Sequence, residues 1–233
     1  MNENAKELIR IIHKTKRPLD TIYFLDKVLE QNPNLDYEFQ VIYIQSYKAL
    51  ASSYRNGIRN TQEEIDEGLH KEAELISRLS TFKKKQVEEL NQICNKGLKV
   101  VDQLILPKTE DFKTKALFLK LKGDLHRYIC ENEQPRNEKR ISLIHETYKA
   151  ALDLVSKDLP AFHQINLGII LNLCVLMFEI MNQKKEAIEL AESTYENASK
   201  EFENQISNDE YYDSLPYLQI LIDNVTLWKN MIQ

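Results

Sequence analysis

The chain has 233 residues, of which 42% are hydrophobic and 29% are charged, so it is long enough to fold around a substantial core. It contains only 5 glycines and 6 prolines, whereas an all-β fold needs turn residues roughly every 8–12 positions. With 31 basic and 36 acidic residues the net charge is -5, which disfavours general binding to nucleic acid or to an anionic membrane. We therefore expect a mostly helical globular protein that has neither as a partner.

The chain shows no feature of secretion or membrane insertion. Residues 1–10 mix charged with apolar positions and lack the apolar segment of a signal peptide. The most apolar stretch, residues 167–178, is too short to span a bilayer and is interrupted by Asn172. An odd number of cysteines, far apart in sequence, suits free thiols in a reducing cytoplasm better than a disulfide framework. The three are Cys94, Cys130 and Cys174.

Breaks in the helical pattern divide the chain into nine predicted helices and no strand. Pro18 can begin a helix because the first turn does not use its missing N–H, and Pro107 ends one. We expect Pro216 to lie in the first turn of the last helix, which would then begin near Ser214. Short connections favour antiparallel packing in a single domain spanning residues 1–233. The predicted helices cover about residues 4–15, 18–31, 35–68, 70–106, 111–131, 138–157, 158–181, 184–204 and 213–231.

Signatures of catalysis are missing from the sequence. The glycines never cluster as a phosphate-binding loop or a dinucleotide fingerprint requires. The one metal-like motif is Glu67-Gly-Leu-His70, but a di-iron site needs a second copy on another helix. We therefore expect no catalytic residue, no cofactor and no metal.

Polar residues instead recur along single faces of four predicted helices, because positions seven apart return to within about 20° of one direction. Each face alone is typical of a solvated surface, but together they predict a groove built by the third, fifth, seventh and ninth helices. Clustered Lys and Arg side chains with a Tyr hydroxyl can bind a phosphate dianion, and Asn side chains can pair with a peptide backbone. The stripes are Lys48 and Arg55; Lys120, Asp124, Arg127 and Tyr128; Asn172, Val175 and Glu179; Asn224 and Trp228.

Three segments carry a family resemblance. They are Lys120-Leu-Lys-Gly-Asp-Leu-His-Arg-Tyr128, Leu167-Gly-Ile-Ile-Leu-Asn-Leu-Cys-Val-Leu-Met-Phe-Glu-Ile180 and Gln219-Ile-Leu-Ile-Asp-Asn-Val-Thr-Leu-Trp228. In this order they resemble the signatures of the 14-3-3 family, dimeric all-helical readers of phosphoserine and phosphothreonine. The resemblance implies an all-α fold whose nine antiparallel helices form a concave amphipathic groove. It also implies a non-catalytic adaptor that regulates phosphorylated clients in signal transduction.

The resemblance assigns roles residue by residue. The phosphate ligands would be Lys48, Arg55, Arg127 and Tyr128. The peptide contacts would be Lys120, Asn172, Val175, Glu179, Ile220, Asn224 and Trp228. A homodimer, or alternatively a heterodimer, would form through ion pairs between Arg17 and Glu89 and between Asp20 and Lys85, beside Phe82.

Several positions depart from the family pattern. Gly57 replaces a serine that controls dimerisation, Phe82 lacks the hydroxyl of a tyrosine, Pro216 replaces a leucine of the groove wall, and Ile222 replaces an arginine. Gly57 cannot be phosphorylated. The changes at Pro216 and Ile222 keep open an alternative, in which the protein is a helical scaffold that binds unphosphorylated partners.

Overall fold

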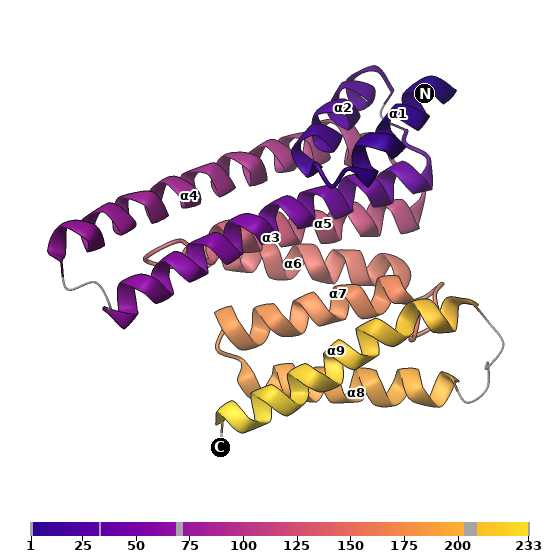
Figure 1. Cartoon of the computed structure of the whole chain (residues 1–233). Coiled ribbons are helices and arrows are strands. Elements are labelled where there is room, and N and C mark those ends of the chain that lie inside the picture. The colour runs from indigo at the N-terminus through magenta and orange to yellow at the C-terminus, as the bar shows by residue number, and fades with distance from the viewer. Residues whose placement is uncertain (1, 33, 69–71, 203–208, 233) are drawn as a thin grey trace. The chain divides into compact units, whose positions relative to one another are not determined.

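The computed structural model describes residues 2–32, 34–68, 72–202 and 209–232, and within these ranges it contains nine α-helices and no strand (Figure 1). The all-α prediction is confirmed. The chain divides into two compact units, one formed by Met1–Thr109 with Tyr128–Gln134 and the other by Glu110–Arg127 with Pro135–Gln233. The single domain over residues 1–233 stays a prediction.

The first unit is built on a long antiparallel pair of helices, α3 and α4, which lie side by side (Figure 1). Helix α2 packs on α3, and α1 packs on α2. Leu25, Phe39, Tyr43 and Leu90 are fully buried between these helices and form the centre of the core. The helices are α1 (Glu3–Lys14), α2 (Pro18–Gln31), α3 (Tyr37–Glu67) and α4 (Ala73–Val100).

Polar caps and proline define several ends as the sequence indicates. The side chain of Asn2 accepts a hydrogen bond from Ala5 N at 2.8 Å and caps α1, and Pro18 occupies the first turn of α2. After α4 the backbone continues as a π-helical turn, Val101–Ile105, and a 3-10 turn, Leu106–Lys108. The α-helical hydrogen-bond pattern therefore ends at Val100, six residues before the predicted end at residue 106. The reason is that Pro107 cannot donate an N–H to the preceding turn.

The second unit is organised around α7, which packs against α6, α8 and α9. Trp228 of α9 stacks on Phe178, with ring centroids 4.6 Å apart and an interplanar angle of 11°. Both rings belong to one buried apolar cluster together with Leu167, Leu171 and Leu221. Its elements are α5 (Phe112–Cys130, up to Arg127), α6 (Glu138–Val155), α7 (Gln164–Val175), the π-helical turn Leu176–Ile180, α8 (Lys184–Phe202) and α9 (Asp209–Ile232).

Helix α7 begins at Gln164 and not near residue 158 as the sequence suggested. The side chain of His163 accepts a hydrogen bond from Ile165 N at 3.1 Å and caps the helix there. Asn166 Nδ2 donates to the carbonyls of Leu159 and Pro160, at 3.3 and 2.8 Å. These side-chain bonds stabilise the preceding residues as a non-helical turn, which propensity alone does not reveal.

Helix α9 begins at Asp209, so the prediction that Pro216 lies in its first turn is wrong. Pro216 lies inside the helix, where it cannot supply the N–H that the carbonyl four residues earlier receives in a regular helix. Burial of Leu218 and Leu221 stabilises α9 despite the proline. Packing of the helix thus outweighs the cost of the missing hydrogen bond.

All three cysteines are free and buried, as predicted. Burial raises the pKa of the Cys94 and Cys174 thiols to about 12, because a thiolate is poorly solvated in the core.

Of the helices in the described part of the chain, none combines the length and apolar character needed to cross a bilayer.

Candidate functional site

Two predicted phosphate ligands, Lys48 and Arg55, lie seven residues apart on α3 in the first unit. Lys48 is half-buried. Among the described residues its ammonium has no hydrogen-bond or ion-pair partner. An unneutralised, partly desolvated cation favours the approach of an anion.

Arg55 is held in one orientation by two neighbours. Its Nε and Nη2 atoms donate to the two carboxylate oxygens of Glu131, at 2.6 and 3.0 Å. Its guanidinium also lies over the ring of Tyr128, 4.7 Å from the centroid. A bidentate ion pair combined with stacking fixes the plane of the guanidinium. The structure therefore brings together Arg55 and Tyr128, two of the predicted phosphate ligands.

In the second unit, Asp124 is the centre of a buried polar network on α5. Its carboxylate is fully buried and accepts hydrogen bonds from Tyr148 Oη at 2.6 Å, Asn172 Nδ2 at 2.5 Å and Lys120 Nζ at 3.2 Å. Arg127 Nη2 lies 3.9 Å from the same carboxylate. The structure thus gathers Lys120, Arg127 and Asn172, three predicted site residues, around one aspartate.

Two cations of this network are buried. Lys120 and Arg127 have side chains only 9% and 8% exposed, and both lie near the carboxylate of Asp124, at 3.2 and 3.9 Å. Lys120 is the nearer partner of this carboxylate, and Arg127 is the more distant one.

Tyr148 of α6 completes the network, and sequence reasoning missed it. Its hydroxyl donates to Asp124 and accepts a hydrogen bond from Arg127 Nε at 3.5 Å. Burial, followed by the charge of Asp124, raises its pKa well above the usual value for tyrosine. A signal was available, because Tyr148 falls on the apolar stripe of Ile141, Ile144 and Val155, where a buried hydroxyl needs a partner.

Gly123 makes room for Tyr148. A Cβ atom at Gly123 would lie 2.5 Å from Cε1 of the Tyr148 ring and 2.8 Å from Cδ1. The glycine before Asp124 is therefore required by close packing of α5 against α6.

Glu131, the partner of Arg55, was also missed, although it lies one helical turn after Arg127 in the sequence.

The predicted peptide contacts of α7 and α9 differ in exposure. Val175 and Asn224 are half-buried, Glu179 is exposed, and Ile220 is 45% exposed. Trp228 is only 3% exposed, because its ring stacks on Phe178. Its contact with a peptide stays a prediction.

Two further residues contribute to this part of the second unit. Leu227 lies seven residues after Ile220 on the same face of α9 and is 56% exposed, an apolar neighbour that the helical spacing could have identified. Arg136 donates to the carbonyl oxygens of Ile180 and Glu179, at 2.7 and 3.3 Å. It thereby fixes the end of the π-helical turn that carries Glu179.

The five predicted dimer residues all lie in the first unit. Arg17 pairs with Asp20 at 2.5 Å, and Lys85 pairs with Glu89 at 3.8 Å. In the single chain each charge thus has a partner within its own segment, and the pairs predicted between subunits stay a prediction. Phe82 is 51% exposed. Other exposed apolar side chains of α1 and α2 are Leu8, Ile11, Leu19 and Tyr23.

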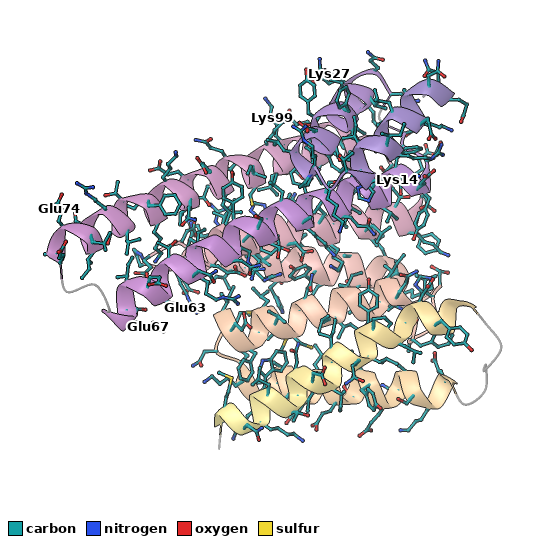
Figure 2. All side chains as sticks on the ribbon, in the orientation of Figure 1. Lys14, Lys27, Glu63, Glu67, Glu74 and Lys99 are labelled. Atoms are coloured by element: carbon teal, nitrogen blue, oxygen red, sulfur yellow. The ribbon has the colours of Figure 1, made fainter. Side chains whose placement is uncertain are left out.

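Within the described residues, no group of three or more His, Cys, Asp or Glu side chains is placed to hold a metal ion. Glu67, from the metal-like motif, is exposed at the end of α3 (Figure 2). His70 lies outside the described residues.

Comparison with known proteins identifies the same family as the motifs. The 14-3-3 protein family matches residues 8–229. The chain is 30% identical to 14-3-3-like protein 1 of Caenorhabditis elegans, over 98% of this chain and 92% of that protein. It is 31% identical to 14-3-3-like protein B of Glycine max, over 97% and 93%. It is 39% identical to 14-3-3 protein I of Plasmodium falciparum over 66% of this chain, a match that spans only 59% of the Plasmodium protein.

Proposed function

Because this chain belongs to the 14-3-3 family, we propose that it is a non-catalytic adaptor that binds phosphoserine and phosphothreonine segments of client proteins and thereby regulates them. Membership of the family supports an adaptor role of this kind in general. The finer proposal assigns the phosphate to Lys48, Arg55, Arg127 and Tyr128.

This proposal rests mainly on the partners of the two cations on α3, Lys48 and Arg55. Arg55 is held rigidly by Glu131 and Tyr128, so little side-chain entropy is lost when it binds an anion. Lys48, seven residues earlier, has no anionic partner among the described side chains. One oriented and one unneutralised cation on the same helix suit a phosphate, which carries more than one negative charge at pH 7.

The network around Asp124 supports the same assignment. Arg127 is buried, and its Nη2 atom lies 3.9 Å from the Asp124 carboxylate, which helps to orient the guanidinium towards an anion. Arg127 and Tyr128 are consecutive residues of α5. The Asp124 carboxylate holds Asn172 by its Nδ2 atom, which leaves the amide oxygen of Asn172 to accept a backbone N–H of the peptide. Asn224 would bind the backbone in the same way, and Val175 and Ile220 would form the apolar wall.

We further propose that the protein acts as a dimer in the cytoplasm. Ile11, Leu19, Tyr23 and Phe82 expose 49–59% of their surface in the single chain, and burial of such side chains is the main source of affinity between subunits. Surface ion pairs such as Arg17 with Glu89 contribute only about 0–1 kcal/mol each. Three buried free thiols suit a reducing compartment.

Fluorescence anisotropy tests the proposed function. A labelled phosphoserine peptide, its unphosphorylated form and a form with glutamate at the same position would be titrated with the wild-type protein, Lys48→Glu and the matched control Lys99→Glu. Lys99 is exposed on α4 (Figure 2). We expect only the phosphopeptide to bind well, because glutamate offers one charge and two oxygens. Hydrogen bonds to charged groups contribute about 1.5–3 kcal/mol, so Lys48→Glu should weaken binding at least about tenfold.

Two results would contradict this proposal. Equal affinity for the three peptides would favour a scaffold that binds unphosphorylated partners. Equal affinity of wild type and Lys48→Glu for the phosphopeptide would remove Lys48 from the site.

A further inference from the structure

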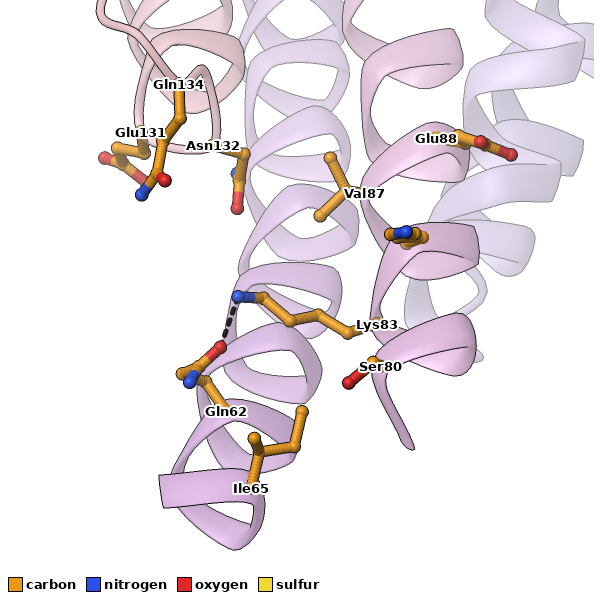
Figure 3. Close-up of a pocket in the computed structure, with 10 residues that line it drawn as sticks. Gln62, Ile65, Ser80, Lys83, Val87, Glu88, Glu131, Asn132 and Gln134 are labelled. Atoms are coloured by element: carbon orange, nitrogen blue, oxygen red, sulfur yellow. Dashed lines mark hydrogen bonds between the residues drawn. The ribbon is translucent and has the colours of Figure 1, made fainter. Parts of the chain in front are cut away.

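A cavity of about 500 Å³ opens between α3 and α4 in the first unit, beside the segment that follows α5. Gln62 and Ile65 of α3, Lys83 and Val87 of α4, and Gln134 line it (Figure 3). We propose that this cavity binds a carboxylate carried on a short apolar stem, with Lys83 as the cation that holds it. The proposal adds a second anion site to the phosphate residues and does not depend on them.

The charge of Lys83 is not balanced by a carboxylate. Its side chain is half-buried and reaches from α4 across to α3, where Nζ donates to Oε1 of Gln62 at 2.5 Å (Figure 3). Among the described residues, this neutral oxygen is the only hydrogen-bond or ion-pair partner of the ammonium. An ammonium has three donors, so two remain for a ligand. By contrast, Lys96 in the same unit pairs with Asp26 at 2.6 Å.

Gln62 is itself held in place. Its Nε2 atom donates to Oδ1 of Asp66, one turn further along α3, at 2.6 Å. That bond orients the amide so that its oxygen faces Lys83. The ammonium is therefore anchored at a defined point of the cavity before any ligand arrives, which lowers the entropic cost of binding.

The two carboxylates that line the cavity do not neutralise Lys83. Both oxygens of Glu131 accept hydrogen bonds from Arg55, at 2.6 and 3.0 Å. Glu88 points away from Gln134 and Asn132 on the far side of α4 (Figure 3). A second cation, Lys84, lines the cavity and is exposed. Lys83 and Lys84 thus place two cations on the lining, and either can attract an anionic ligand.

The apolar residues that line the cavity indicate which group should carry the carboxylate. Ile65 and Val87 supply apolar surface on α3 and α4, so a bare inorganic ion would leave this surface unused. The amide of Gln134 provides a further polar contact (Figure 3). A carboxylate attached to one or two methylene groups matches both the ammonium of Lys83 and the apolar surface of Ile65 and Val87. It could belong to a Glu or Asp side chain of a bound protein or to a free small carboxylic acid.

Nuclear magnetic resonance tests the site with propionate, which has this chemistry, and with propionamide, its neutral counterpart of the same shape. The side-chain amide signals of Gln62, Asn132 and Gln134 report on the cavity in ¹⁵N-labelled protein. We expect propionate to shift these signals in a saturable manner, and propionamide and equimolar sodium chloride to leave them unchanged. Lys83→Gln should weaken propionate binding about tenfold or more. Lys99→Gln, on an exposed part of α4, should not.

A second arm identifies the source of the carboxylate. Phosphoserine peptides with a single glutamate moved along the sequence would be compared with glutamine versions. If the carboxylate comes from a client, glutamate at one position should strengthen binding several-fold in wild type but not in Lys83→Gln. If it comes from a free acid, wild type and Lys83→Gln should differ in their affinity for propionate but not in their affinity for the glutamate peptides. The proposal is overturned if propionate leaves the amides unshifted, or if it binds equally to wild type and a folded Lys83→Gln. A failure of the phosphopeptides to bind would overturn the proposed function alone.

Discussion

Substitution of Gly123 by alanine should destabilise the protein, although alanine is the better helix former. Gly123 lies in the middle of α5, where Gly→Ala ordinarily stabilises by about 0.5–1 kcal/mol. Here the added Cβ would approach three ring atoms of Tyr148, Cε1, Cδ1 and Cζ, at 2.5, 2.8 and 2.9 Å. Tyr148 is fully buried and hydrogen-bonded to Asp124, so its ring cannot move freely.

Two costs oppose the gain in helix propensity. Overpacking of a buried site typically costs about 1–3 kcal/mol. If the ring moves to relieve the contact, the bond from Tyr148 Oη to the Asp124 carboxylate is lost, and this costs about 1.5–3 kcal/mol. After subtraction of the gain in helix propensity, we expect a net decrease of about 1–2 kcal/mol in the free energy of unfolding.

Urea denaturation followed by circular dichroism measures this difference, and Gly57→Ala is the matched control. Gly57 also lies inside a long helix, but a Cβ there would meet Nε2 of Gln86 at 2.8 Å, the end of a flexible side chain. Gly57→Ala should therefore remain within about 1 kcal/mol of wild type. If Gly123→Ala were as stable as Gly57→Ala, the close packing of α5 on Tyr148 could not be the reason for the glycine.

Other parts of the structure give three further predictions. Asp124→Asn should lower the free energy of unfolding by about 3–5 kcal/mol in urea, because it removes the buried carboxylate that accepts hydrogen bonds from Tyr148, Asn172 and Lys120; a loss below about 1 kcal/mol would contradict the network. Burial raises the pKa of Cys94 and Cys174 to about 12, so a thiol reagent at pH 8 should label neither until urea is added, and their contribution to stability should fall as pH rises from about 9 towards 12. Pro216→Ala should raise the melting temperature, since it restores an N–H inside α9; an unchanged or lower value would refute this.

The fold was largely predictable because its helices end at residues with strong local preferences. Pro18 at the start of α2 and the periodic stripes of α3 and α5 act through near neighbours in sequence. The start of α9 was not predictable in the same way. Pro216 favoured a later start, but burial of Leu218 and Leu221 stabilises a helix that begins at Asp209.

In the candidate site, likewise, residue pairs on one helix could be predicted from the sequence, and contacts between helices could not. Helical spacing indicated Lys48 with Arg55 and Lys120 with Arg127, because those pairs lie on single helices. Tyr148 contacts Asp124 from a different helix, 24 positions later in the sequence, and spacing along one helix contains no information about that contact. The cavity at Lys83 likewise depends on how α3 and α4 pack.

The central claim is that Lys48, Arg55, Arg127 and Tyr128 bind one phosphate. A crystal structure of the protein with a phosphoserine peptide tests this most directly. We predict phosphate oxygens within about 2.7–3.2 Å of all four side chains, with Glu131 still in contact with Arg55. A phosphate bound by other residues, or one that contacts only the cations of α3 or only Arg127, would contradict the claim.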